Sequence, residues 1–106
     1  KMKNGNKVMK ITKGVIRTEE GIQDIPAYVT KCSSSLMHFL EEGSTVTIKA
    51  MGNRAIANTM KTIARAGKLL ETENKVLEIS TPVFILEKIA DTDSELAVFN
   101  INVSVR

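Results

Sequence analysis

The chain has 106 residues, of which 42% are hydrophobic and 25% charged, so we expect a single domain (residues 1–106) with one modest core. Its apolar stretches are far shorter than the roughly 20 residues of a bilayer-spanning helix, so no membrane partner is expected. The net charge of +3 is mild but unevenly distributed: residues 1–17 hold six cations and no acid, which favours an anionic partner.

The N-terminal segment and the single cysteine indicate a cellular setting. Lysines follow the basic N-terminus where a signal peptide has an apolar run, and we expect residues 1–6 to be a flexible basic segment. Cys32 has no second cysteine with which to form an internal disulfide. A reducing compartment, the cytoplasm or the nucleus, is therefore expected.

The first third of the chain predicts a strand, a loop and a helix. Residues 7–17 predict a strand, in one piece or in two pieces interrupted at Gly14, and residues 18–24 predict an acidic, polar loop. The following helix has Asp24 as its expected N-cap, Pro26 in its first turn and Gly43 at its end. Its apolar residues are spaced four and three apart, as on one helix face: Ile25, Val29, Cys32, Leu36 and Phe39.

The middle third predicts a strand and a second helix. Residues 45–51 alternate between apolar and polar side chains, which indicates a strand covered on one face. Gly52 and Asn53 then predict a turn and a helix cap. The second helix is expected from about Arg54 to Leu70, and its predicted buried face consists of Ile56, Met60, Ile63, Gly67 and Leu70.

The last third predicts a long antiparallel hairpin. Residues 76–90 and 96–105 are rich in β-branched residues and flank a polar turn at residues 91–95. Pro82 cannot donate a backbone hydrogen bond, so it marks a bulge or an edge position. The element order is β-α-β-α-β-β. It predicts an α+β, two-layer sandwich with two helices on one face of a four-stranded sheet.

Enzymatic chemistry is not indicated by the sequence. A glycine-rich phosphate loop and a dinucleotide fingerprint are both absent. His38 and Cys32 lie six residues apart on one helix and therefore on different faces, where we expect a surface histidine and a core cysteine. We therefore predict no catalytic residue, no metal site, no cofactor and no small-molecule substrate.

The second helix carries a stripe of cations. Arg54, Asn58, Lys61, Arg65 and Lys68 are spaced four and three apart, offset from the predicted apolar stripe by about 200° around the helix. Like charges at this spacing repel each other by a few tenths of a kcal/mol, which a bridging anion would offset. On this feature alone, a solvated helix face and a phosphate-binding face are equally good interpretations.

The start of the second helix adds a second indication of anion binding. Lys49 ends the preceding strand, and Gly52 and Arg54 surround the expected helix N-terminus. Free backbone N–H groups and the helix dipole favour an anion at such a position.

The segment IKAMGNRAIANTM, residues 48–60, resembles the Alba family of small nucleic-acid-binding proteins. The shared features are Lys49 at the end of a strand, the Gly52 turn and Ala55-Ile56 at the start of a helix, together with the element order. Residues 80–105 are similar to the eukaryotic branch, which includes small subunits of ribonuclease P and MRP. The resemblance implies a dimer, either a homodimer or a heterodimer with another Alba-type chain, that forms a saddle on nucleic acid with RNA preferred over DNA.

Three departures from the family pattern narrow the expected binding surface. Residues 18–24 stand where Alba proteins commonly carry a lysine pair, the hairpin tip at residues 91–95 is acidic, and one extra residue follows Gly52. The second helix and the N-terminal lysines remain as the expected contact surface for nucleic acid. The predicted nucleic-acid-binding residues are Lys49, Gly52, Arg54, Lys61, Arg65, Lys68, Lys7, Lys10 and Lys13.

Two alternatives stay open. The protein can be an interaction subunit of a ribonucleoprotein that pairs with another Alba-type chain; Leu96 and Val98 would suit a partner, or they pack under the first helix. A weaker alternative is another RNA-binding module, such as one similar to the C-terminal domain of a translation initiation factor.

Overall fold

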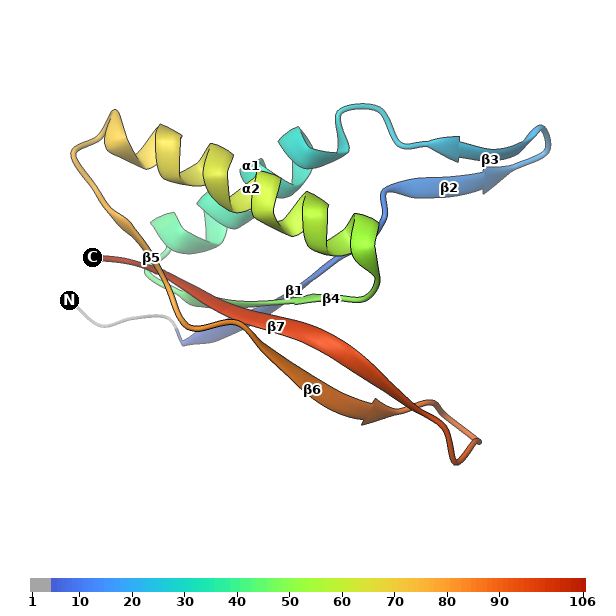
Figure 1. The fold of residues 1–106 in the computed structure, drawn as a ribbon. Helices are drawn as coiled ribbons and strands as arrows, with labels where there is room; N and C mark the ends of the chain where they lie inside the picture. The colour runs from blue at the N-terminus through green and yellow to red at the C-terminus, as the bar shows by residue number, and fades with distance from the viewer. Residues whose placement is uncertain (1–4) are drawn as a thin grey trace.

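Two helices lie on one face of a mixed sheet, and two hairpins project from the same end of the molecule (Figure 1). The computed structural model describes residues 5–106. Of the predicted flexible segment, residues 1–4 lie outside this range, and Asn6 already belongs to a strand. The elements are β1 (Asn6–Ile11), β2 (Val15–Thr18), β3 (Gly21–Asp24), α1 (Tyr28–Glu41), β4 (Thr45–Ala50), α2 (Asn53–Glu71), β5 (Leu77–Ile79), β6 (Val83–Lys88) and β7 (Glu95–Val105).

The main sheet confirms an α+β architecture and has five strands instead of the predicted four. β4 pairs in parallel with β1 and antiparallel with β7, while β5 and β6 both pair with β7 on its other side. The predicted strand at residues 76–90 is thus two strands separated by residues 80–82. Pro82 lies in this break, because its nitrogen cannot join the hydrogen-bonded ladder.

The predicted loop at residues 18–24 is wrong. These residues form a hairpin with β2, and Thr18 pairs with Gly21 across a two-residue turn of Glu19 and Glu20. The hairpin is a separate two-stranded sheet, and all four β3 residues are exposed. The two strands pair with each other, but neither face of this hairpin is covered by the rest of the protein. The alternation that normally reveals a strand is therefore missing from its sequence.

Helix α1 follows its predicted apolar stripe but begins differently. Its N-cap residue is Ala27, with a φ of 52°, and no side chain caps it within the described part of the chain. Asp24 as the cap is therefore wrong; it ends β3, and Pro26 precedes the helix. Cys32 and Leu36 are buried as predicted.

Helix α2 is rotated relative to its predicted buried face. Its buried residues are Ala55, Thr59, Thr62, Ile63, Ala66 and Leu70. Met60 was predicted to be buried but is 43% exposed. The small side chains at the centre of the buried face let α2 pack closely on α1 and the sheet. At about 100° per residue, the basic stripe lies about 120° from the centre of this face rather than opposite it.

The core lies between the helices and the sheet. Val46 and Ile48 of β4 are fully buried, which confirms the predicted alternation in residues 45–51, and Ile101 and Val103 of β7 are each 1% exposed or less. Side chains of the opposite phase lie on the sheet face that the helices leave uncovered, called the open face below (Figure 1). This face carries Lys10 and Lys49.

Candidate nucleic-acid interface

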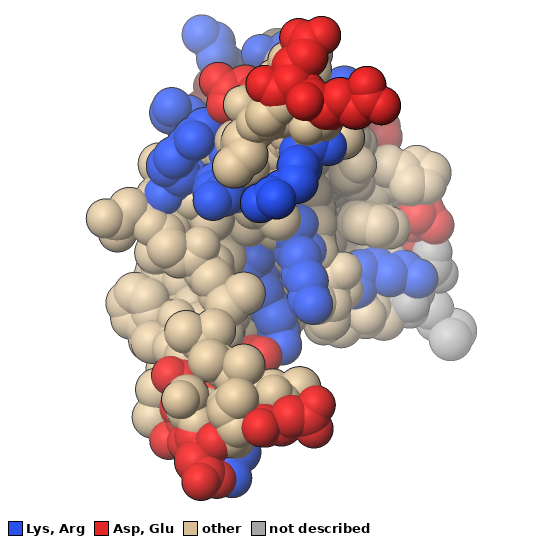
Figure 2. Space-filling view, turned by 90° about the vertical axis from the view of Figure 1, so that its right-hand side faces the viewer, with Lys and Arg blue, Asp and Glu red and all other residues tan. Residues whose placement is uncertain are grey.

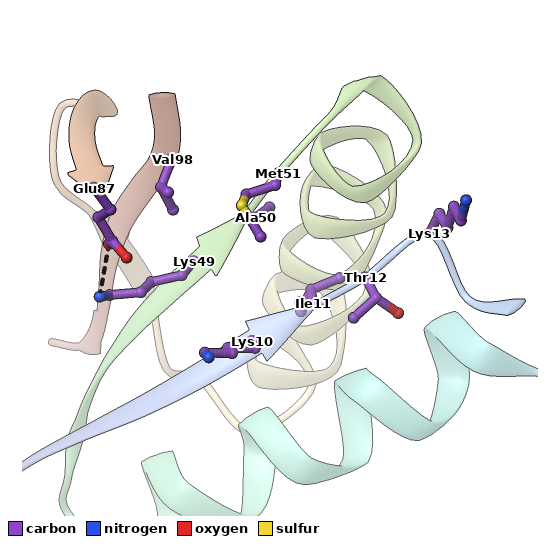
Figure 3. A pocket seen from close by; sticks show the side chains of 9 residues that line it. All are labelled: Lys10, Ile11, Thr12, Lys13, Lys49, Ala50, Met51, Glu87 and Val98. Atoms are coloured by element: carbon purple, nitrogen blue, oxygen red, sulfur yellow. Dashed lines mark hydrogen bonds and ion pairs between the residues drawn. The ribbon is translucent and has the colours of Figure 1, made fainter. Parts of the chain in front are cut away.

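A pocket of about 340 Å³ opens where β1 and β4 end, beside the base of the β6–β7 hairpin (Figure 3). Its lining includes Ile11, Ala50 and Val98, which are all buried, and the exposed Met51. Val98 therefore does not pack under α1, as one of the two interpretations had it, and is not free for a partner. The sequence pattern placed Val98 and Leu96 together, but only Leu96 is exposed.

Three of the predicted lysines line this pocket: Lys10, Lys13 and Lys49, called the basic cleft below. Lys10 and Lys49 are direct register partners on the parallel strands β1 and β4, so both side chains start from the same sheet face (Figure 3). Like charges placed directly opposite on neighbouring strands destabilise the sheet. An anion that bridges the two ammonium groups would offset this repulsion.

One acid already partly neutralises the basic cleft. Lys49 Nζ lies 3.0 Å from Glu87 Oε2, an ion pair that spans from β4 to β6 (Figure 3). The two side chains are 31% and 43% exposed, so the pair contributes little to stability. Its main consequence is positional, because Glu87 holds the Lys49 ammonium over the pocket.

The loop that carries Lys13 is held by several hydrogen bonds. The backbone N–H of Thr12 donates to the Tyr28 hydroxyl at 2.8 Å, and Asn58 Nδ2 donates to the carbonyl oxygen of Thr12 at 3.0 Å. Gly14 has a φ of 75°, and a Cβ there would lie 2.8 Å from Tyr28 Cδ2. Side chains from both helices thus fix the end of β1, and with it the position of Lys13.

Gly52 connects the basic cleft to helix α2. Its φ of 87° and ψ of 162° belong to a region that is open essentially to glycine alone. No side chain of the described residues caps the helix at this end, which lies on the side from which the hairpins project (Figure 1). The first-turn N–H groups therefore add positive potential next to the lysines.

Gly52→Ala is expected to destabilise the fold by about 1–3 kcal/mol, because alanine must adopt this strained backbone conformation. A Cβ at Gly52 meets no atom within 4 Å, so the cost comes from the backbone alone. Gly67→Ala, in the interior of α2 and equally free of neighbours, is the matched control and is expected to stabilise by about 0.5–1 kcal/mol. Urea denaturation measures both; effects of the same sign would contradict the conformation at Gly52.

The other predicted site residues lie outside the cleft. Arg54, in the first turn of α2, pairs with Asp24 Oδ1 at 3.3 Å, and both side chains are largely exposed. Lys61, Arg65 and Lys68 are exposed along α2. With Arg54 they form the helix stripe. Lys7 is the register partner of the buried Val46 and so starts from the opposite sheet face to Lys10, away from the cleft.

The charges around the cleft are arranged in bands. Figure 2 looks at the side from which both hairpins project: lysine and arginine side chains gather in the middle, and acidic side chains lie above and below. Both hairpins end in acidic turns, and the β2–β3 turn consists of Glu19 and Glu20. The turn between β6 and β7 includes Asp91 and Asp93. On this side of the molecule, a band of lysine and arginine side chains therefore lies between two acidic hairpin turns (Figure 2).

Cys32 and His38 occupy the positions expected from the sequence. Cys32 is buried, and burial raises the pKa of its thiol above the ordinary value, so the reactive thiolate is disfavoured. His38 is on the surface and contacts Glu42 at 3.2 Å. Within residues 5–106, three or more potential metal-ligating side chains do not cluster anywhere, and neither helix has the length and hydrophobicity of a membrane span.

Sequence reasoning named the lysines but missed what groups them. The adjacency of Lys10 and Lys49 follows only from the parallel register of β1 and β4, and the Lys49–Glu87 contact depends on β6 lying beside β7. A period-two pattern in residues 6–11 would have put Lys10 on the open face. No local pattern in the sequence identifies Glu87 as the counterion of Lys49.

No protein-family model matches this chain, and no curated protein matches it in sequence.

Proposed function

We propose that the protein is a non-enzymatic nucleic-acid-binding protein that contacts the phosphate backbone through the basic cleft and the helix stripe. The observation that carries the proposal is that Lys10, Lys13 and Lys49 all line one pocket beside the N-terminus of α2. Two of these lysines face each other across neighbouring strands, an arrangement that an anion stabilises.

The helix stripe extends this surface. From Arg54 to Lys68 the helix rises about 21 Å at 1.5 Å per residue. Phosphates along one strand of a duplex are spaced about 3.4 Å along the axis, so the stripe is long enough to meet several of them. The exposed Arg54–Asp24 pair is weak, and a phosphate can replace the carboxylate.

RNA is the proposed ligand in preference to DNA, a choice that rests on the Alba resemblance alone. Fluorescence anisotropy with labelled single- and double-stranded RNA and DNA, at several salt concentrations, tests the proposal. Binding that weakens steeply as salt rises is expected, because phosphate contacts release condensed counterions. Absence of binding, or affinity that does not change with salt, would overturn it. An Arg54/Lys61/Arg65/Lys68 charge-reversal variant measures the share of the helix stripe.

Glu87→Gln is expected to tighten nucleic-acid binding about two- to fivefold. The substitution keeps the shape of the side chain but removes a carboxylate that competes with phosphate for Lys49. Glu78→Gln is the matched control, because Glu78 lies on β5, outside the basic cleft, and pairs with Arg106. Anisotropy titrations of both variants at one salt concentration decide; equal affinities for the two would show that Glu87 does not compete.

A second candidate function, pairing with another chain, is favoured by strand β6. Its side chains Val83, Phe84, Ile85 and Leu86 are 49%, 63%, 47% and 64% exposed, so apolar groups are exposed on both faces of the strand. Four consecutive apolar side chains exposed to this degree are typical of an interaction surface. We propose that the protein acts as a dimer through β6, with itself or with a chain of the same type.

Phe84→Glu together with Leu86→Glu is expected to convert a dimer to a monomer, because charged side chains would be desolvated in the contact. Light scattering after gel filtration measures the mass of each. Glu87 and Lys88 on the same strand remain unchanged, so the strand keeps its own charges. A wild-type monomer at high concentration would exclude self-pairing through β6.

A further inference from the structure

Strand β1 forms one edge of the main sheet. In the described part of the chain it pairs only with β4, so its other edge has no neighbouring strand. The backbone N–H of Thr45 donates to the carbonyl oxygen of Gly5 at 3.0 Å, and the direction of the backbone groups alternates from residue to residue along a strand. The N–H and C=O groups of Asn6, Val8 and Lys10 therefore point away from β4, where a further strand could pair with them.

The open edge of β1 ends at Thr12. The N–H of this residue is the next in the outward series, and it donates to the Tyr28 hydroxyl at 2.8 Å. The hydroxyl oxygen thus takes the place that a carbonyl oxygen of a neighbouring strand would take. The backbone groups that remain for a partner are those of residues 6–10.

Helix α1 and this edge together line a groove of about 470 Å³. Four residues of α1, spaced three and four apart on one helix face, belong to its lining: Tyr28, Lys31, Ser35 and Phe39. Val8 of β1 is 58% exposed in this groove, called the edge groove below. A free strand edge beside a helix face is an arrangement in which extended peptides bind by adding a strand to the sheet.

The edge groove is positively charged on both sides. Lys10 lines it from β1 and Lys31 from α1, and no acid among the described residues lines it. A second copy of the chain would bring its own Lys7 and Lys10 against this edge, so like charges disfavour strand pairing between two copies. A partner strand with acidic side chains is attracted instead.

The unpaired backbone groups favour a peptide among the possible anionic partners. Nucleic acid matches the two lysines, but it has no backbone groups that continue a β ladder. The side chains of an added strand alternate between the two faces of the sheet. One set therefore meets Phe39 and Lys31 on the helix side, and the other meets Val8 and Lys10 on the open face.

We propose that the edge groove binds an extended segment of another protein that carries apolar and acidic side chains and pairs with β1 as a further strand. This proposal does not depend on nucleic-acid binding in the basic cleft. Lys10 lines both sites, so the variants that test the edge groove leave Lys10 unchanged.

Anisotropy with three labelled octapeptides tests the proposal: alternating valine and glutamate, alternating valine and lysine, and the valine–glutamate peptide N-methylated at every residue. The first is expected to bind at least about tenfold more tightly than either of the others, because only it has both the charge and the backbone donors. Absence of binding by the valine–glutamate peptide, or equal affinity for all three, would overturn the proposal.

Ser35→Glu places a carboxylate in the edge groove and is expected to weaken binding of the valine–glutamate peptide about fivefold. Ser34→Glu is the matched control, since Ser34 is the preceding exposed residue of α1, lies outside the groove and gives the same net charge. Circular dichroism verifies that both variants fold. Equal peptide affinities in the two variants would overturn the proposal.

Two further measurements on the same pair of variants decide between occupants. RNA affinity and the mass from light scattering are both expected to be the same in Ser35→Glu and Ser34→Glu. A loss of RNA affinity confined to Ser35→Glu would assign the groove to nucleic acid, and a loss of self-association confined to it would assign the groove to a second copy. Either result would overturn the peptide proposal.

Discussion

Replacing Lys10, Lys13 and Lys49 with glutamate is expected to weaken RNA binding about 100-fold or more. Each substitution removes an attraction to phosphate and adds a repulsion, and near a protein surface each such contact is worth on the order of 1 kcal/mol or more. Three contacts at one site sum to at least about 3 kcal/mol, which corresponds to more than 100-fold in affinity. Anisotropy at fixed salt measures the change.

The control for this variant must carry the same charge. Lys31→Glu, Lys75→Glu and Lys88→Glu also change the net charge from +3 to about −3, but none of the three lines the basic cleft. We expect this variant to lose less than about tenfold, through long-range repulsion alone. Equal losses in the two variants would mean that binding depends on overall charge and not on the cleft.

Leu36→Ala is expected to destabilise the fold by about 2–5 kcal/mol. Leu36 is fully buried between α1 and the sheet, and its truncation removes apolar contacts and leaves a cavity. In a domain whose total stability is about 5–15 kcal/mol, this lowers the melting temperature by at least about 10 °C. Thermal unfolding followed by circular dichroism measures the shift.

Leu69→Ala makes the same chemical change on the surface. Leu69 is 42% exposed on α2, so its truncation is expected to cost less than about 1 kcal/mol. A small effect at Leu36, or effects of similar size at both positions, would contradict the placement of α1 over the sheet. Neither residue lines the basic cleft, so RNA affinity below the melting transition is expected to stay unchanged in both variants.

The parts of the fold that sequence predicted are those in which a buried face imposes a period. Val46 and Ile48 alternate with polar residues because one face of β4 covers the core, and Cys32 and Leu36 keep helical spacing because α1 packs on the sheet. Such periods are set by the geometry of each element and can be detected without tertiary information.

The parts that were missed depend on contacts remote in sequence. The β2–β3 hairpin has no buried face, so its strands lack the alternation that a sheet over a core imposes. In α2 the largest apolar residues suggested the buried face, whereas close packing selects Ala55, Thr59 and Ala66 and leaves Met60 exposed. The size of a side chain is therefore a poor guide to burial where a helix approaches its neighbours closely.

In the candidate site too, the features visible in local sequence were predicted and those that depend on remote contacts were not. The composition of the N-terminal segment and of α2 predicted which cations to consider, since a run of lysines without acids is visible in sequence alone. Their separation into a concave cleft and a convex stripe was not predictable, because Lys10 and Lys49 are brought together only by strand register. Lys7 shows the converse: it is close to Lys10 in sequence but starts from the other face of the sheet.

The most direct test of phosphate binding in the basic cleft is the salt dependence of RNA affinity. The logarithm of the binding constant falls linearly with the logarithm of salt concentration, with a slope of about −0.7 per phosphate contacted on a single strand. Relative to the wild type, a Lys10→Gln, Lys13→Gln, Lys49→Gln variant is expected to have a slope shallower by about 2, the amount for three lost contacts. Identical slopes for the two proteins would contradict the assignment of these lysines to phosphate.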